Sequence, residues 1–230
     1  MGLGSVESRV LSDLAAEGKN IFSIRELAKK MPSRAAARKL ASTLVRKGWL
    51  ERLNKGIYLI MELAAGSKPE WSEDAFYIAS KLCETCYIGY LSMLHHYSWT
   101  EQIPSTITIA SLTSIKRKKI HETTYEFITL SKKKFFGFKE MNIRGHPIMV
   151  SDPEKTIADA LDHPEYCGGI DEVAKAILVA KVDWLKVISY ADKMGNGAVF
   201  KRMGFLLEKM NTPISIEIIN EIKKRITKGY

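Results

Sequence analysis

The stretch IFSIRELAKKMPSRAAARKLASTLVRKGWLERLNKGIYLI, residues 21–60, decides the fold of the N-terminal quarter of the chain. Ser23 and Glu26 form an S-x-x-E capping box, which predicts that a short helix begins at Ser23. Pro32 ends that helix, and Ser33 is placed to cap another one. We therefore expect two consecutive helices joined by a tight turn.

The second helix has one apolar face. Its members recur at the spacing of a buried helical stripe, and they are Ala37, Leu40, Ala41, Leu44 and Val45. Gly48 is placed to close the helix. Residues 49–53 and 57–60 are then predicted as strands, with residues 54–56 as the turn between them. A helix, a turn, a second helix and a hairpin in succession predict a winged helix-turn-helix.

The exposed face of this module is rich in cations. The candidate DNA-binding residues are Ser33, Arg34, Arg38, Lys39, Ser42, Arg46 and Lys47 on the helix and Arg52, Asn54 and Lys55 on the hairpin. Arg and Lys side chains reach phosphates or the edge of guanine when a helix lies in the major groove. The alternative is a solvated charged face, because every amphipathic helix has one and some winged helices dock proteins instead.

The positive charge is concentrated in the same quarter of the chain. The 230 residues have a formal net charge of +9. Residues 1–60 contain 12 Lys and Arg against 5 Asp and Glu, whereas residues 61–230 contain 23 against 21. This distribution is expected if the release of counterions from phosphates drives binding there.

The composition also indicates in which cellular compartment the protein acts. No apolar run reaches the length of a membrane span, and no basic region followed by an apolar core begins the chain. Three cysteines are too few for a disulfide scaffold and suit a reducing compartment. We expect a cytoplasmic protein that does not bind membranes.

The rest of the chain predicts an α+β protein of two domains, at residues 1–63 and 70–230, with a linker at residues 64–69. A first helix is expected over residues 5–17. The second domain begins with a helix over residues 72–82 and a short helix over residues 91–97, and its strands are expected at residues 87–89, 106–110, 125–130 and 148–150. Helices follow from Asp152 onward, at about residues 153–161, 170–180, 183–192, 198–210 and 214–226. The lysine runs at residues 116–119 and 132–134 are predicted as exposed loops, with an enlarged footprint on nucleic acid as the alternative.

Two segments of the second domain, together with the winged helix, resemble a known family. Residues 92–97, SMLHHY, and residues 152–159, DPEKTIAD, are similar to segments of the AbiEi-type antitoxins of abortive-infection toxin–antitoxin systems. The resemblance implies a transcriptional repressor of its own operon, whose N-terminal domain binds inverted repeats in double-stranded DNA. It also implies a partner toxin of nucleotidyltransferase type and no enzymatic activity in this chain. A palindromic operator could be served by a homodimer or by two cooperating monomers.

The sequence also contains residues that could form a metal site or a nuclease site. Cys83 and Cys86 form a C-x-x-C with His95 and His96 nearby, but a zinc site needs four converging donors, so we predict no metal. We expect Cys83 and Cys86 to be small core residues and one of the two histidines to lie at a polar edge of the core. Glu154 and Lys155 could belong to a nuclease, although a helix start explains them better. A ligand-sensing regulator without a toxin is a further alternative. No nucleotide-binding or common hydrolytic motif is present, and we predict neither a cofactor nor a catalytic residue.

Overall fold

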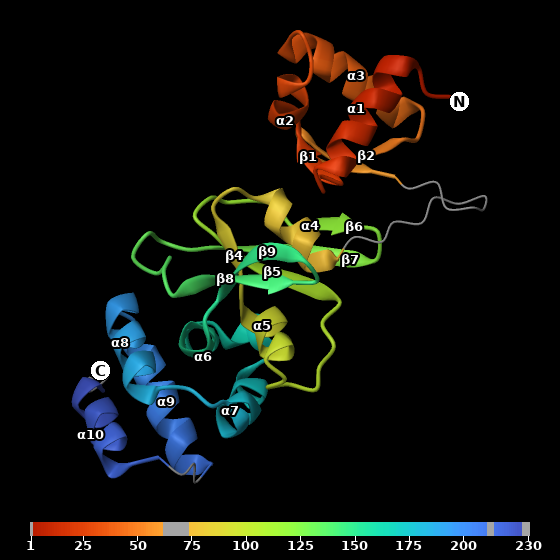
Figure 1. Ribbon diagram of the computed structural model, residues 1–230. Coiled ribbons are helices and arrows are strands. Elements are labelled where there is room, and N and C mark those ends of the chain that lie inside the picture. Colours follow the sequence, from red (N-terminus) through yellow and green to blue (C-terminus); the bar gives the residue numbers. More distant parts are fainter. Residues whose placement is uncertain (1, 62–73, 211–213, 227–230) are drawn as a thin grey trace. The chain divides into compact units, whose positions relative to one another are not determined.

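The computed structural model describes residues 2–61, 74–210 and 214–226, which divide into two units, Met1–Glu84 and Thr85–Tyr230 (Figure 1). The predicted linker and the start of the predicted helix at Ser72 lie outside the described residues. The domain limits 1–63 and 70–230 therefore stay predictions. The predicted α+β class with an N-terminal winged helix is confirmed by the architecture of the units.

In the described residues of the N-terminal unit, three helices and a small sheet follow the order of a winged helix-turn-helix, and a fourth helix comes after them. These are α1 (Ser5–Ala16), β1 (Ile21–Ser23), α2 (Ile24–Lys29), α3 (Arg34–Arg46), β2 (Leu50–Asn54) and β3 (Ile57–Ile60), followed by α4 (Ala75–Leu82). The sheet is antiparallel in the order β1-β3-β2. The sequence did not predict β1, because three residues are too few to show alternation. Its pairing with β3 ties the start of α2 to the hairpin.

The local signals that predicted the two helices are confirmed. Ser23 Oγ accepts a hydrogen bond from the Glu26 amide at 3.2 Å, and a Glu26 carboxylate oxygen accepts one from the Ser23 amide at 2.8 Å. Ser33 Oγ accepts from the Ala36 amide at 3.1 Å and so caps α3. Gly48 follows the end of α3 with a left-handed φ of +80°. Short-range polar chemistry therefore sets both helix starts.

The core of this unit lies between α1 and the buried stripe of α3. Ala37, Ala41 and Leu44 are fully buried. Leu40 is only partly buried, and Val45, which we predicted on the buried face, is 37% exposed. The prediction for Val45 was wrong because this residue lies at the margin of the stripe whose buried members are Ala37, Ala41 and Leu44.

The C-terminal unit is built on a mixed sheet of six strands. The strands are β4 (Cys86–Ile88), β5 (Thr106–Ser111), β6 (Lys118–Ile120), β7 (Thr123–Thr129), β8 (Phe138–Ile143) and β9 (His146–Ser151), in the order β6-β7-β5-β4-β9-β8. The pairs β5–β7 and β4–β9 are parallel, and the other neighbours are antiparallel. The sequence missed β6 and β8. Both are edge strands, whose polar side chains hide the apolar pattern of a buried strand.

The structure confirms the loop prediction for part of each lysine run and corrects the rest. Exposed positions outside helices and strands are occupied by Lys116, Arg117, Lys132 and Lys133, but Lys118 and Lys119 belong to the edge strand β6. In the second run, Lys134 Nζ lies 2.5 Å from a carboxylate oxygen of Asp162, whose side chain is 1% exposed. Lysine is common at sheet edges because its charge opposes pairing with another chain. Lys134 instead compensates a buried acid.

Helices cover the sheet and form the rest of the unit. They are α5 (Tyr90–His96), α6 (Pro153–Asp162), α7 (Ile170–Val179), α8 (Trp184–Met194), α9 (Gly197–Lys209) and α10 (Ile216–Arg225), with a short 3-10 helix at Pro164–Cys167. Figure 1 shows α5 and α6 on one face of the sheet, with the later helices beyond them. Helix α6 contacts α5, α7, α8 and α9, so it is the centre of the core.

Candidate nucleic-acid interface

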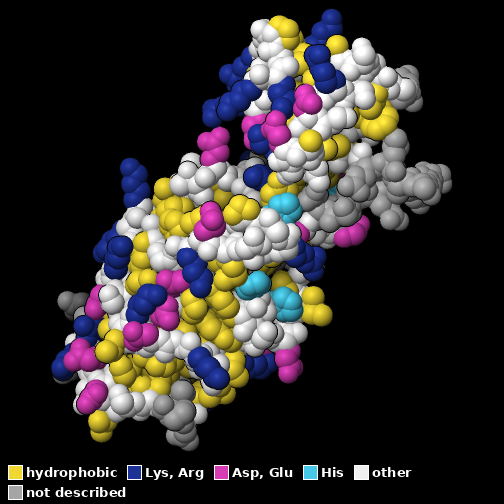
Figure 2. Space-filling model, viewed as in Figure 1, with side chains coloured by type: hydrophobic (Ala, Val, Ile, Leu, Met, Phe, Trp, Pro, Cys, Tyr) yellow, Lys and Arg dark blue, Asp and Glu magenta, His cyan; other side chains and the backbone are white. Residues whose placement is uncertain are grey.

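Most of the candidate DNA-binding side chains are exposed on α3 and the hairpin. The exposed ones are Ser33, Arg34, Arg38, Lys39, Ser42, Arg46, Arg52 and Lys55, whereas Lys47 and Asn54 are partly buried. Figure 2 shows Lys and Arg side chains gathered over one side of this unit. The unit therefore presents a cationic surface on its outer helix and on its wing.

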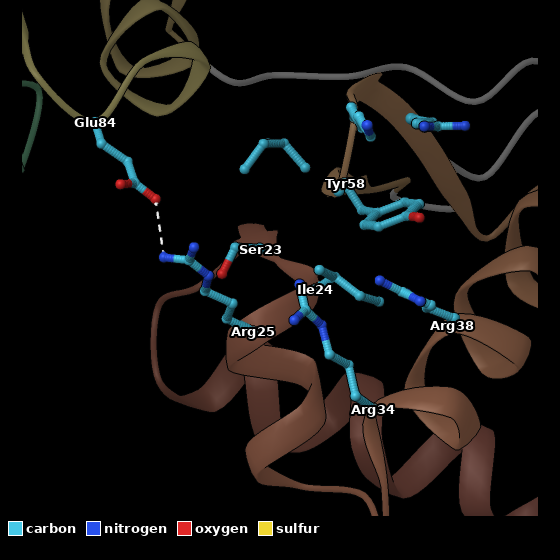
Figure 3. Close-up of a pocket in the computed structure, with 11 residues that line it drawn as sticks. Ser23, Ile24, Arg25, Arg34, Arg38, Tyr58 and Glu84 are labelled. Carbon is cyan, nitrogen blue, oxygen red and sulfur yellow. Dashed lines mark hydrogen bonds and ion pairs between the residues drawn. The ribbon is translucent and has the colours of Figure 1, made fainter.

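A cleft lies between the starts of α2 and α3 and the wing. It has a volume of about 440 Å³ and is lined by Ser23, Ile24, Arg25, Arg34, Arg38, Arg52, Lys55, Gly56, Ile57, Tyr58 and Glu84 (Figure 3). Five of these residues are cations and one is an acid. Four of the cations were candidates from the sequence. Arg25 was not, because nothing in its spacing along the chain shows that β1 brings α2 against the hairpin.

The wing is held in place at its tip. The Ile24 amide donates to the Gly56 carbonyl oxygen at 2.7 Å, which links the first residue of α2 to the turn of the hairpin. Gly56 has a left-handed φ of +77°, and a Cβ there would lie 3.2 Å from Ile24 Cγ2. Only glycine adopts this backbone geometry without strain and also allows so close an approach. The two walls of the cleft are therefore fixed relative to each other.

Asn54 serves the turn of the wing. Its Oδ1 accepts from the Lys55 amide at 2.8 Å, and its Nδ2 donates to the Leu82 carbonyl oxygen at 3.3 Å. Arg52 Nε donates to the Asn54 carbonyl oxygen at 3.3 Å, next to an irregularity in the register of β2 and β3. Local hydrogen bonds of this kind are how Asn stabilises turns. They orient Arg52 toward the cleft.

Lys47 is already paired inside the unit. Its Nζ lies 2.6 and 2.8 Å from the two carboxylate oxygens of Glu7, and its side chain is only 20% exposed. Glu7 has a pKa below its ordinary value because Lys47 hydrogen bonds to the carboxylate. The charge of Lys47 is thus compensated by α1. Among the candidate cations it is the least available to a phosphate.

The acidic residues at the start of α6, which we considered as part of a nuclease site, form contacts within the fold. Asp152 caps α6 by accepting from the Lys155 amide at 2.7 Å, and it accepts from the Tyr190 hydroxyl at 2.8 Å. Glu154 lies 2.7 Å from Lys186 Nζ. These contacts lower the pKa of Glu154, against the effect of its partial burial, and raise the pKa of Lys186. They join the start of α6 to α8, so the acids serve packing.

Lys155 points the other way, into the core. Its ammonium group forms an ion pair with Asp159, and both side chains are almost fully buried. Asp159 also accepts a hydrogen bond from the Tyr87 hydroxyl at 3.0 Å, and Lys155 Nζ lies 5.0 Å from the centre of the Phe136 ring. Lys155 and Asp159 are four residues apart on α6, so their side chains meet on one face of the helix, and that face is buried. Glu154 and Lys155 therefore do not converge on a common reacting atom.

The cysteines and histidines differ from what we predicted. Cys83 and Cys86 are partly buried rather than core residues, and His95 and His96 are both exposed. Cys83 follows α4 and Cys86 begins β4, so they lie at the ends of elements, where packing is incomplete. Within the described part of the chain, no three His, Cys, Asp or Glu side chains gather as metal ligands would. In the same residues, no helix has both the length and the apolar composition needed to cross a bilayer.

Part of the N-terminal unit is similar to a known protein family. Residues 9–60 match the family model of the AbiEi antitoxin, described as a transcriptional regulator. The match confirms the predicted resemblance to the AbiEi family for the winged helix, and residues 92–97 and 152–159 lie outside the matched range. The match begins within α1 and ends at the last residue of β3, so the AbiEi-like region is the winged helix that carries the cationic cleft.

One solved structure is similar in fold to the whole chain. The RV2827C protein from Mycobacterium tuberculosis superposes with a TM-score of 0.65 at 15% identity, covering 100% of this chain and 84% of that one. At this identity the likeness shows a shared fold. No curated protein sequence matches the chain. The AbiEi match is therefore what connects the chain to a regulator.

Proposed function

We propose that this protein is a DNA-binding transcriptional repressor that acts in the cytoplasm as the antitoxin of a toxin–antitoxin pair. The observation that carries the proposal is the exposed cationic face of α3, next to a wing whose position is fixed, within the stretch that matches AbiEi regulators. A helix of this kind fits the major groove, and the wing then meets the neighbouring phosphates or minor groove. Bound over its own promoter, the protein represses its operon.

The antitoxin role is supported by the family match and by the resemblance of residues 92–97 and 152–159. The partner we propose is a nucleotidyltransferase-type toxin encoded next to this protein. In the second unit, the acids and lysines at the start of α6 bind one another and α8, so they support a structural role for that segment and no enzymatic activity in this chain. The operator we propose is an inverted repeat.

Binding to DNA is tested by titrating the full chain against a duplex from its own promoter at several salt concentrations. The variant Arg38→Ala/Lys39→Ala should weaken binding by about 1–3 kcal/mol for each lost base contact, and by a salt-dependent amount for each lost phosphate contact. The control is Lys201→Ala/Lys209→Ala, which removes two exposed cations from α9. Equal affinities for the Arg38→Ala/Lys39→Ala variant and the unmodified protein would overturn the proposed DNA-binding face.

The antitoxin role is tested separately. The neighbouring open reading frame is expressed under an inducible promoter, with and without this protein, and growth is followed. Growth arrest by the neighbour that is relieved by this protein supports the proposal. A neighbour that is harmless, or one whose arrest this protein does not relieve, would remove the antitoxin role and leave a regulator.

A further inference from the structure

The cleft divides the candidate residues into two groups. Arg34 and Arg38 line it from α3, and Arg52 and Lys55 line it from the wing, whereas Lys39, Ser42 and Arg46 lie outside it. The division follows from the turn of the helix. At about 3.6 residues per turn, positions three and four apart share a face. Ala35, Lys39, Ser42 and Arg46 are spaced in this way, and all four are exposed, opposite the buried stripe at Ala37, Ala41 and Leu44.

The outermost stripe of a helix in the major groove is the part that reaches the base edges. Residues on its flank face the sugar-phosphate backbone instead. In this unit Arg34 and Arg38 lie on the flank that faces the wing, as shown by their place in the cleft wall. The geometry of α3 therefore separates a stripe that faces outward from a flank that faces the wing.

We infer that the cleft is a clamp for one phosphodiester strand and that Arg25 is a further residue of this clamp; the inference rests on the proposed binding of DNA. Five cations from three elements surround a volume of about 440 Å³. Such a group of like charges repels itself and is relieved when an anion enters. Guanidinium groups suit phosphate because they donate two hydrogen bonds in one plane.

The described contacts leave the clamp open to a phosphate. The Arg25 guanidinium lies 3.4 Å from a carboxylate oxygen of Glu84, and the two side chains are 72% and 89% exposed (Figure 3). An ion pair so exposed contributes little, so a phosphodiester displaces the carboxylate at small cost. The bond from Ile24 to Gly56 keeps the wing in place, which means that the clamp is formed before DNA arrives.

The residues of the cleft and those of the outer stripe of α3 therefore have different roles in binding DNA. Arg25, Arg34, Arg38, Arg52 and Lys55 position the protein on any duplex, and Ala35, Lys39 and Ser42 distinguish one sequence from another. Lys or Arg can donate to guanine, Ser to several base edges, and the Ala methyl group packs against the methyl group of thymine. Arg46 lies at the far end of the stripe, where the helix leaves the groove.

The test uses two duplexes of equal length, one with the operator sequence and one with a scrambled sequence. The quantities measured are the salt dependence of binding, called the salt slope, and the ratio of the affinities for the two duplexes. Each variant of the full chain is titrated over a range of salt concentrations. Arg25→Ala and Arg52→Ala should each weaken binding to both duplexes by the same factor and reduce the salt slope by about 1, without changing the ratio of the two affinities. Lys39→Ala and Ser42→Ala should lower that ratio about 5- to 100-fold, mainly through the operator.

The matched control is Lys29→Ala. Lys29 is exposed on the same helix as Arg25 but does not line the cleft, so its loss should leave the slope and the ratio nearly unchanged. A changed affinity ratio in Arg25→Ala, or an unchanged salt slope, would overturn the clamp. If the unmodified chain binds neither duplex, the proposed function itself fails, which is a distinguishable result.

A second arm separates a DNA phosphodiester from free phosphate. Inorganic phosphate replaces chloride at constant ionic strength, and the melting temperature and the affinity for DNA are measured. The clamp predicts stabilisation only at high millimolar phosphate. If micromolar phosphate stabilises the chain and Arg25→Ala abolishes the effect while DNA affinity is unaffected, the cleft binds a free anion and the inference is wrong.

Discussion

Lys47 donates to both carboxylate oxygens of Glu7, so a cation that the sequence assigns to DNA instead holds the first helix of the unit to the end of α3. Lys47→Ala should therefore lower the melting temperature and leave the salt slope of DNA binding almost unchanged. Arg25→Ala should do the opposite, because Arg25 lines the cleft and its ion pair with Glu84 is too exposed to stabilise the unit much. Thermal melts and salt-dependent titrations of both variants check this. A reduced slope for Lys47→Ala would show that Glu7 releases it to DNA.

Gly56 permits the close contact between the wing and α2. Gly56→Ala introduces a left-handed alanine whose Cβ lies 3.2 Å from Ile24 Cγ2, and this should cost about 1 kcal/mol or more and weaken DNA binding about 10-fold. Gly48→Ala is the matched control. Gly48 is also left-handed, at φ +80°, but a Cβ there meets no atom within 4 Å. Equal loss of DNA affinity in the two variants would contradict a fixed wing.

The pair between Lys155 and Asp159 is buried in the C-terminal unit. Lys155→Met leaves the buried Asp159 carboxylate, among the described residues, with the Tyr87 hydroxyl as its remaining partner, so it should destabilise the unit by about 3–5 kcal/mol. The double variant Lys155→Met/Asp159→Leu removes both charges and should recover much of that loss. Urea denaturation followed by circular dichroism measures both. A double variant no more stable than the single one would show that the pair itself is needed.

Acid should weaken the N-terminal unit through Glu17. Hydrogen bonds from Lys19 and then Lys30 lower the pKa of Glu17 from 4.5 to about 2. Because the folded pKa is below the unfolded one, the stabilisation is present above about pH 4.5 and is lost as the pH falls toward 2. The melting temperatures of the unmodified chain and of Glu17→Gln should therefore differ at pH 6 and converge near pH 2. A constant difference over this range would exclude the linkage.

Local chemistry predicted much of this fold, and long-range pairing accounts for what was missed. Ser23, Ser33 and Asp152 begin their helices as expected, because a cap and its partner amide lie within three residues of each other. Periodicity also located α3 and the helices after α6.

The clamp could not be predicted in the same way. Arg25 comes to the wing through the pairing of β1 with β3, and the partner of Lys47 lies 40 residues earlier in the chain. Neither relation leaves a pattern in adjacent residues. The edge strands β6 and β8 were missed because they have few buried positions, so neither an alternating nor a continuous apolar pattern marks them in the sequence. The sequence therefore did not predict which charged side chains lie close to one another in the fold.

The outermost strand β6 carries Lys118 and Lys119 along the rim of the six-stranded sheet. A foreign strand that extended the sheet there would bring its own backbone beside two lysine side chains, and lysine at a sheet edge disfavours such pairing. The two lysines therefore oppose aggregation through this edge when the protein is present at high concentration. Replacing both lysines with threonine should therefore make the overproduced protein more prone to precipitate, which a comparison of soluble yields measures.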